Sequence, residues 1–259
     1  MFQGAAIPLT QEGLDALSVE LAVPLPALWS VLAVETSGCG FLPDRRPLIL
    51  FERHWFSKLT KRQFDAAHPD ISNPVAGGYG PRGASQYQRL ERAIALDRVA
   101  ALRSASWGLG QVMGFNAEDV GFANVDALVA ACVESEDGQM RAMAGYIKSR
   151  NLATRLHDED WAGFALRYNG TDFQKNKYDT KLAMANARFK VGPLPDLTVR
   201  WVQMALQYLG FAAGGVDGWF GAQTQRALIA FQKSTGLAAT GLPDPGTKAA
   251  LHSRFAALA

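Results

Sequence analysis

Residues 195–251 read PDLTVRWVQMALQYLGFAAGGVDGWFGAQTQRALIAFQKSTGLAATGLPDPGTKAAL and predict a small helical unit at the end of the chain. The first segment repeats apolar residues at helical spacing, so that Val199, Val202 and Leu206 fall on one face. Gly214-Gly215 and Asp217-Gly218 then supply turns, because glycine accepts a positive φ at little cost. A second helix is expected over 224–233 and a third over 244–252.

The order of short motifs in this unit is more informative than any one of them. It resembles the peptidoglycan-binding domain of cell-wall hydrolases, with a VQ-x-x-L helix, a VDG-x-FG turn, an FQ helix and a closing T-x-x-AL. The matching residues are Trp201-Val202-Gln203, Val216 to Gly221 with Thr224, Phe231-Gln232, Gly236-Leu237, Thr240-Gly241, and Thr247 with Leu251. Most are core or turn types, so they indicate a fold more directly than a wall contact. Trp219, beside the turn, is either a sugar-stacking face or a core residue.

The length and charge of the chain agree with two units. A chain of 259 residues, 48% of them hydrophobic, can fill two cores. The formal charge of +2 lies in the tail, and no basic run suggests a nucleic-acid partner. Pro193-Leu194-Pro195 interrupts the helical periodicity. We therefore predict a catalytic domain over 1–192 and a peptidoglycan-binding domain over 193–259, each folding independently, with the tail acting as a tether.

The start of the chain, MFQGAAIPLTQEGLDALSVELAV, has Asp15 and Glu20 where a signal peptide or membrane anchor would need an unbroken apolar run. Cys39 and Cys132 lack the spacing of metal ligands, and we expect buried thiols suited to a reducing cytosol. A wall-directed enzyme of this kind fits a bacteriophage endolysin. We expect it to be made in the host cytoplasm and to act on the wall after release by a separate membrane-lesion protein.

Helical periodicity dominates the first 190 residues, which indicates a mainly α fold. Helices are expected over 10–22, 24–34, 85–104, 126–148 and 160–168, the fourth broken near Gly138. The apolar run 47–56 favours extended structure, and the glycine- and proline-rich segment 69–83 favours a loop.

Three places in this part carry side chains suited to chemistry on a glycan. Glu35 ends an apolar helix before a glycine-rich break, and partial desolvation there should raise its pKa. A carboxylic acid that keeps its proton near neutral pH can donate it to the leaving oxygen of a glycosidic bond. Gln111 stands among glycines that permit close approach of a sugar, and Tyr168-Asn169-Gly170 ends a helix. Singly, each also has a structural interpretation: a solvated helix end, a tight turn and a cap.

Taken in order, these places resemble the lysozyme-like superfamily, and more closely the N-acetylmuramidase family of bacteriophage endolysins. That family combines E-(S/T)-x-G-x-GF, RP-x-ILFE-x-H-x-F, SASWG-x-x-Q-(V/I)-MG-FN, RYNG and YDTKL. The corresponding segments are Glu35 to Phe41, Arg46 to Phe56, Ser104 to Asn116, Arg167 to Gly170 and Tyr178 to Leu182. The resemblance covers about residues 10–188 and implies a lysozyme-like catalytic domain. It implies Glu35 as general acid, with Gln111, Tyr168 and Asn169 lining the sugar groove.

A second carboxylate is needed if the enzyme hydrolyses a glycoside, and two candidates follow Glu35. Asp44 has the spacing of the Glu-Asp pair of phage-type lysozymes, but Leu50 stands where that pattern expects threonine. Glu52 lies inside an apolar run, where a buried carboxylate must be paired or functional. Glu52 is favoured as the second catalytic residue, with a structural salt bridge as the alternative.

Other classes of function are weighed against hydrolysis. A lytic transglycosylase would use Glu35 without water and release a 1,6-anhydro product. An amidase or peptidase would need zinc ligands, and His54, His68, His157 and His252 show no such spacing. A non-enzymatic phage structural protein could keep the fold while binding murein. We expect a monomeric muramidase that needs no metal or other cofactor and whose partner is bacterial peptidoglycan.

Overall fold

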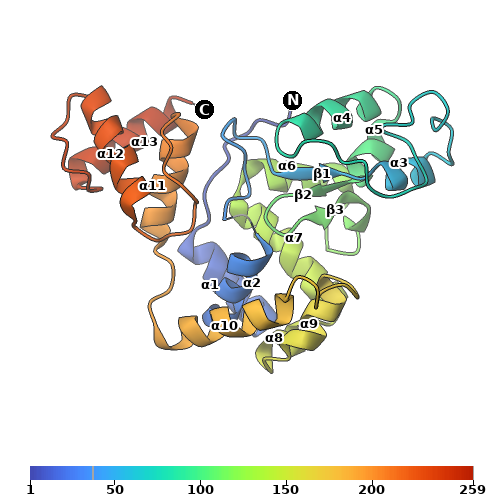
Figure 1. Ribbon diagram of the computed structural model, residues 1–259, viewed down its shortest axis with the longest axis horizontal. Helices are drawn as coiled ribbons and strands as arrows, with labels where there is room; N and C mark the ends of the chain where they lie inside the picture. Colours follow the sequence, from blue (N-terminus) through green and yellow to red (C-terminus); the bar gives the residue numbers. More distant parts are fainter. Residues whose placement is uncertain (37, 259) are drawn as a thin grey trace.

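The computed structural model describes residues 1–36 and 38–258 and is mainly helical, as predicted. Two lobes make up the catalytic unit, and a separate cluster of three helices follows at the end of the chain (Figure 1). Ser37, in the predicted break after Glu35, lies outside the described residues. The helices of the catalytic unit are α1 (Gln11–Leu21), α2 (Leu25–Glu35), α3 (Arg53–Leu59), α4 (Ser85–Ile94), α5 (Arg98–Arg103), η1 (Gly114–Asn116), α6 (Val125–Glu134), α7 (Glu136–Ser149), α8 (Ala153–His157), α9 (Trp161–Tyr168) and α10 (Tyr178–Val191).

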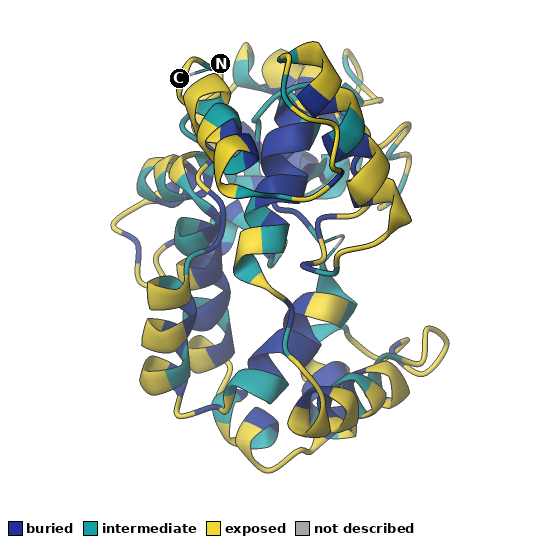
Figure 2. Cartoon of the chain, turned by 90° about the vertical axis from the view of Figure 1, so that its left-hand side faces the viewer, coloured by how far each residue is buried: buried dark blue, intermediate teal, exposed yellow. Residues whose placement is uncertain are grey.

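The first lobe consists of α1, α2 and α8–α10, packed around one apolar core with part of α7. Thr10 begins α1 by accepting a hydrogen bond from the Gly13 N–H, which satisfies one free donor of the first turn. Pro24 precedes α2, and Thr36 ends it in extended conformation. Figure 2 shows that buried residues follow the inward faces of these helices. Glu35 is thereby fixed at the last turn of a helix that the core holds on most sides.

The second lobe surrounds a small antiparallel sheet of β1 (Ile49–Phe51), β2 (Ala105–Trp107) and β3 (Val112–Met113). Ile49 pairs with Trp107 across the first ladder, and Trp107 pairs with Val112 across the second. Helices α3–α6 complete the second core around this sheet. Helix α7 contributes to both cores, with Met140 and Met143 in the first and Ala142 in the second. It therefore joins the lobes.

Some elements differ from the sequence-based expectations, each for a local reason. The helix expected over 85–104 is two helices, because Asp97 caps a new one by accepting from the Ala100 N–H. The break expected near Gly138 falls at Ser135, whose side chain accepts from the Gly138 N–H. Extended structure covers only 49–51 of the run 47–56, since α3 begins at Arg53. Helices α8 and α10 and the strands β2 and β3 were not expected.

The tail forms α11 (Leu197–Tyr208), α12 (Ala222–Ser234) and α13 (Pro245–Ala256), close to the three helices expected. Two buried glutamines tie its turns together. Gln203 donates to Asp217 Oδ1 (2.9 Å) and accepts from the backbone N–H of Gly218 (2.9 Å). Gln232 likewise donates to Thr247 Oγ1 (2.8 Å) and accepts from the Gly241 N–H (2.8 Å). These motif residues therefore hold the fold of the tail together.

The tail is docked onto the catalytic unit through a buried ion pair. The guanidinium of Arg200, on α11, binds both carboxylate oxygens of Glu136 and donates to the Gly38 carbonyl (2.5 Å). An apolar cluster continues the contact, made of Ala6, Cys39, Phe41, Met204, Tyr208 and Val216. Gly38 has φ of +89°, and a Cβ there would lie 2.9 Å from the Val216 carbonyl oxygen. Removing the tail would leave Glu136 buried without its cation. That each unit folds independently stays a prediction.

Both cysteines are buried free thiols, as predicted. Over the described part of the chain, none of the helices alone has the length and apolar character needed to cross a membrane; the bent pair α1–α2 meets those two criteria only when both helices are counted together.

Candidate active site

Glu35 combines burial with very few hydrogen-bond donors. Asn169 Nδ2 donates to Glu35 Oε2 (2.6 Å), whereas Glu35 Oε1 is buried without a hydrogen-bond partner. Burial raises the pKa of Glu35 to about 7, because desolvation outweighs the hydrogen bond from Asn169 and the positive charge of Lys181. The carboxyl group therefore still holds a proton in a large fraction of molecules at neutral pH, as an acid catalyst requires.

Glu35 opens into a cavity of about 400 Å³ between the two lobes, here called the active-site cavity. All three residues predicted to line a sugar groove lie in its wall. It is lined by Glu35, Gly110, Gln111, Val112, Met113, Phe115, Asn116, Tyr146, Arg150, Tyr168 and Asn169. Glu35 is the one carboxylate among these lining residues, and the remainder offer amides, ring faces and a guanidinium. This mixture suits the hydroxyl and acetamido groups of a sugar.

Tyr168 and Asn169 reach the cavity from the end of α9. The Tyr168 hydroxyl donates to the Gly110 carbonyl (3.2 Å), and its ring stacks on Phe164 with centroids 5.0 Å apart. These contacts fix the helix end opposite α2. Asn169 caps α9 in a right-handed conformation, and Gly170 takes the positive φ of +87°. The cap and the hydrogen bond to Glu35 are thus made by the same residue, which joins the structural and functional interpretations.

Gln111 lies in the cavity wall, but its amide is engaged within the protein. Its Oε1 accepts from Ser106 Oγ (2.8 Å) and its Nε2 donates to the Gly108 carbonyl (2.8 Å). The backbone of Gln111 has φ of +46°, a conformation that non-glycine residues seldom adopt. The side-chain hydrogen bonds of Gln111 therefore stabilise a tight turn between β2 and β3. Its main role in the cavity is to shape the wall.

Glu52 lies apart from the lining of the active-site cavity, at the N-terminus of α3. Its Oε2 is 3.1 Å from His54 Nδ1, yet the two atoms are not aligned for a hydrogen bond, and both are buried without one. Burial, and then the charge of Glu52, raises the pKa of Tyr79. Among the described residues, buried side-chain atoms without partners occur only at Glu35, Asn169, Glu52 and His54. Unsatisfied groups are therefore confined to the neighbourhoods of the two predicted carboxylates.

Asp44, the other candidate, is occupied by Arg46. Its Oδ2 accepts from Arg46 Nε (2.8 Å) and Nη2 (2.6 Å), and its Oδ1 accepts from the Arg46 N–H. A carboxylate held by three donors of one arginine stabilises the turn before β1. It does not line the active-site cavity.

Sequence reasoning missed three polar residues of the cavity wall. Arg150 follows α7 and donates to Asn116 Oδ1 (3.4 Å), and its guanidinium lies 5.5 Å from the ring centroid of Tyr146. Tyr146 also meets Tyr168 edge to face. Tyr146 and Arg150 are one helical turn apart, which is a signal for a shared face, but the expected helix ended at Lys148.

A glutamate that retains its proton near neutral pH, set between two lobes and followed by a docked helical unit, is what a lysozyme-like cell-wall hydrolase requires, and the chain falls in that class. It belongs to the N-acetylmuramidase family, whose sequence model matches residues 24–190. The model of a peptidoglycan binding domain matches residues 196–251. The family resemblance inferred from the motifs is therefore confirmed, and so is the resemblance of the tail.

Two known proteins are similar to parts of this chain. The crystal structure of the Burkholderia AP3 phage endolysin superposes with a TM-score of 0.67 at 37% identity, covering 70% of each chain. The N-acetylmuramoyl-L-alanine amidase CwlM of Mycobacterium tuberculosis is 47% identical over 60 residues, which is 23% of this chain. The match spans only 15% of that amidase, so it carries no argument for amidase chemistry here.

Proposed function

We propose that the protein hydrolyses the β-1,4 bond between N-acetylmuramic acid and N-acetylglucosamine in peptidoglycan. The observation that carries this proposal is Glu35, a carboxyl group with a pKa of about 7 in a polar cavity between two lobes. Membership of the N-acetylmuramidase family supports the same bond.

In the proposed reaction, Glu35 transfers its proton to the bridging oxygen while the bond from that oxygen to the anomeric carbon breaks. The electron pair of the broken bond stays with the oxygen, which leaves as a hydroxyl, and positive charge develops on the sugar ring. Asn169 keeps Glu35 aimed into the cavity through its 2.6 Å hydrogen bond. Once ionised, Glu35 accepts further stabilisation from the same amide, which makes proton donation easier.

Hydrolysis is completed by water, and we propose Glu52 as the group that activates it. The support is the buried, unsatisfied Glu52 Oε2 beside His54 Nδ1, an arrangement that is costly unless it serves a function. This role requires the bound sugar to lie between the two carboxyl groups, about 6.5–9.5 Å apart, so that Glu52 accepts a proton from water as the water oxygen attacks the anomeric carbon. Exchange with solvent then removes the proton from Glu52 and restores the one that Glu35 donated. The reaction yields one reducing end and one free hydroxyl for each water consumed.

A second candidate reaction at the same bond is lytic transglycosylation. It is favoured by one observation: Glu35 is the one carboxylate in the lining of the active-site cavity. In that case the ionised Glu35 would take a proton back from the 6-hydroxyl of the muramic acid, whose oxygen closes on the anomeric carbon.

We also propose a biological setting. The combination of a muramidase unit with a peptidoglycan-binding tail, and the similarity to a phage endolysin, supports lysis of a bacterial host from within. The protein would be made in the host cytoplasm and reach the wall after the membrane is breached. The tail would raise the local concentration of substrate by holding the catalytic unit at the wall.

Mass spectrometry of digested sacculi tests the proposal in one measurement. Hydrolysis predicts products with reducing-end muramic acid. Anhydro-muramic ends would establish transglycosylation instead, and reducing-end glucosamine would place the cut at the other glycosidic bond. Free peptide stems would contradict glycosidase activity altogether.

A further inference from the structure

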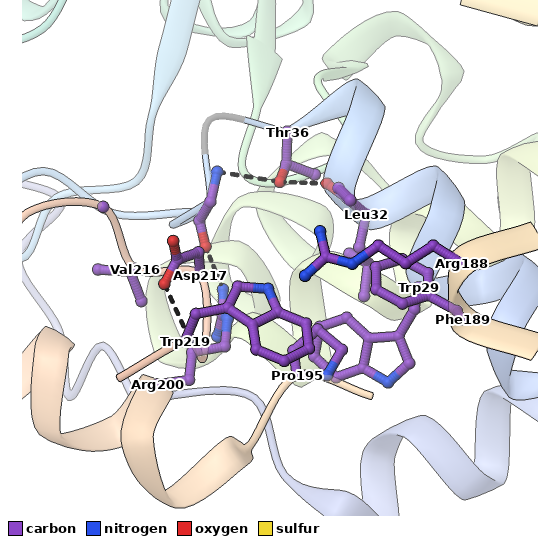
Figure 3. A pocket seen from close by; sticks show the side chains of 13 residues that line it. Trp29, Leu32, Thr36, Arg188, Phe189, Pro195, Arg200, Val216, Asp217 and Trp219 are labelled. Atoms are coloured by element: carbon purple, nitrogen blue, oxygen red, sulfur yellow. Dashed lines mark hydrogen bonds between the residues drawn. The ribbon is translucent and has the colours of Figure 1, made fainter. Parts of the chain in front are cut away.

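A second cavity, of about 410 Å³, lies at the junction of the catalytic unit and the tail (Figure 3). We call it the junction cavity. Its wall takes residues from α2, α10, the linker and the turn after α11, among them Trp29, Thr36, Arg188, Pro195, Asp217 and Trp219. Both cavities reach the end of α2, because Glu35 lines the active-site cavity and Thr36 lines this one. Residues adjacent in the sequence thus line the two cavities.

The apolar side of the junction cavity is held rigidly. Trp29 is only 5% exposed, and Trp219 packs against the same core from the tail. The backbone of Trp219 is fixed at both ends, since its N–H donates to Asp217 Oδ1 (2.9 Å) and its carbonyl accepts from Gln203 (3.1 Å). One face of the Trp219 ring is covered by the Arg188 guanidinium, 4.6 Å from the ring centroid. A sugar stacked on that face would have to displace the cation.

Two charged groups in this wall have no ionic partner among the described residues. Arg188 is exposed and forms no ion pair, in contrast to Arg200, whose guanidinium is consumed by Glu136 and Gly38. Asp217 accepts hydrogen bonds from neutral groups only, Gln203 and the Trp219 N–H. Within the described part of the chain, the cavity therefore presents one unpaired cation, Arg188, and one unpaired carboxylate, Asp217, beside its aromatic residues.

We infer that the junction cavity binds the peptide stem of peptidoglycan, with a stem carboxylate at Arg188 and a stem ammonium group at Asp217. This inference rests on the proposed function, which supplies the glycan in the active-site cavity. The stem carries free carboxylates and, at its diamino acid, a free amine, and both find a partner here. The glycan itself offers no ammonium group, and the lactyl carboxyl of each muramic acid is uncharged where a stem is attached to it by an amide bond. In this inference, the stem of a muramic acid bound beside Glu35 reaches the junction cavity past Thr36, the next residue of the chain.

The test measures binding rather than turnover. Full-length protein with Glu35→Gln is titrated with a soluble glycan fragment of two disaccharides. The fragment either carries its peptide stems or is stripped of them, with the lactyl carboxylates that stripping frees capped as amides. The stem-bearing fragment should bind more tightly. Arg188→Gln should weaken its binding about 10-fold, the effect of losing one charge-assisted hydrogen bond, and should leave the stripped fragment unchanged. Arg188→Lys should keep most of the affinity.

Arg226→Gln is the matched control, because Arg226 is an exposed arginine of the tail outside the junction cavity. It should leave both affinities unchanged. Equal affinity for the two fragments in the parent protein, or an equal loss for both with Arg188→Gln, would overturn the inference. The proposed function is tested separately, by analysing the products that the unsubstituted protein releases from peptidoglycan. Stem binding that depends on Arg188, without any glycosidic cleavage, would overturn the function and keep the binding site.

Discussion

Glu35 and Glu136 are both withdrawn from water, but their surroundings differ. Glu136 accepts from the backbone N–H groups of Leu9 (2.9 Å) and Gly40 (2.8 Å) and from both ends of the Arg200 guanidinium. Glu35 accepts from Asn169 alone, and one of its oxygens has no partner. The number of hydrogen-bond donors around a buried carboxylate therefore separates the two roles. Many donors stabilise the charged form in a structural contact, whereas few donors leave the carboxyl group able to hold and release a proton.

The largest effect is expected from removing the proton donor, Glu35. Glu35→Gln should lower turnover on soluble peptidoglycan fragments by about 10²–10⁴-fold, because an amide has no acidic proton to give. Turnover and thermal unfolding are measured on the same preparation. Normal specific activity in a folded variant would show that Glu35 is not the acid.

Removing the partner of Glu136 should act on stability instead. Arg200→Met leaves a buried carboxylate without its cation, which costs about 3–5 kcal/mol of unfolding free energy. Urea unfolding measures the loss, and turnover per folded molecule should change far less than with Glu35→Gln. A chain ending at Val191 should share the defect.

Arg226→Met, an exposed change of the same type, is the control for Arg200→Met and should cost less than about 0.5 kcal/mol. If the two variants unfold alike, the buried pair does not hold the units together.

The raised pKa of Glu35 also makes the stability of the protein depend on pH. As pH rises from 4.5 towards 7, the unfolded chain releases this proton while the folded protein keeps it, so stability falls. The total loss is about 3 kcal/mol and is complete above pH 7. Glu35→Gln removes it, so the variant should match the parent below pH 4.5 and exceed its stability above pH 7. Unfolding free energies of both proteins from pH 4 to 8 check this, and a difference that is constant with pH would contradict it.

Glu52 should give the smallest of these effects. If it activates water, Glu52→Gln should slow hydrolysis about 100-fold, at the lower end for acid–base groups, and any residual product should shift towards the anhydro form. The melting temperature should change little, since His54 is the one ionic partner of Glu52 among the described residues. A lower melting temperature with full turnover per folded molecule would assign Glu52 a structural role.

Much of the fold was predictable because its signals are local. Apolar spacing and caps at Thr10 and Asp160 place helices directly, and the tail's motif residues proved to be those that tie its turns. Helix α10 was missed because its apolar residues are spread around the helix, while the face that becomes buried carries a polar residue: Leu182, Asn186 and Phe189 are buried. The helix depends on packing against α2, which no local pattern announces.

The site was predictable in part for a similar reason. Glu35, Tyr168 and Asn169 carry motifs, and the structure brings them together. Glu136 gave no signal, because an acidic residue in the first turn of a helix is expected for electrostatic reasons alone. Its partner Arg200 is distant in sequence and lies on the other unit, so only the docked structure reveals the pair.

Because the tail is docked, different opening events expose the two cysteines to solvent. Burial raises the thiol pKa of both Cys39 and Cys132 to about 12, so neither is reactive while covered. Cys39 is covered by residues of the tail, whereas Cys132 is enclosed in the second catalytic core. The rate of Cys39 alkylation therefore reports separation of the tail from the catalytic unit. The rate of Cys132 alkylation reports opening of the second core. Comparing the two alkylation rates by mass spectrometry therefore distinguishes undocking of the tail from unfolding of the catalytic unit.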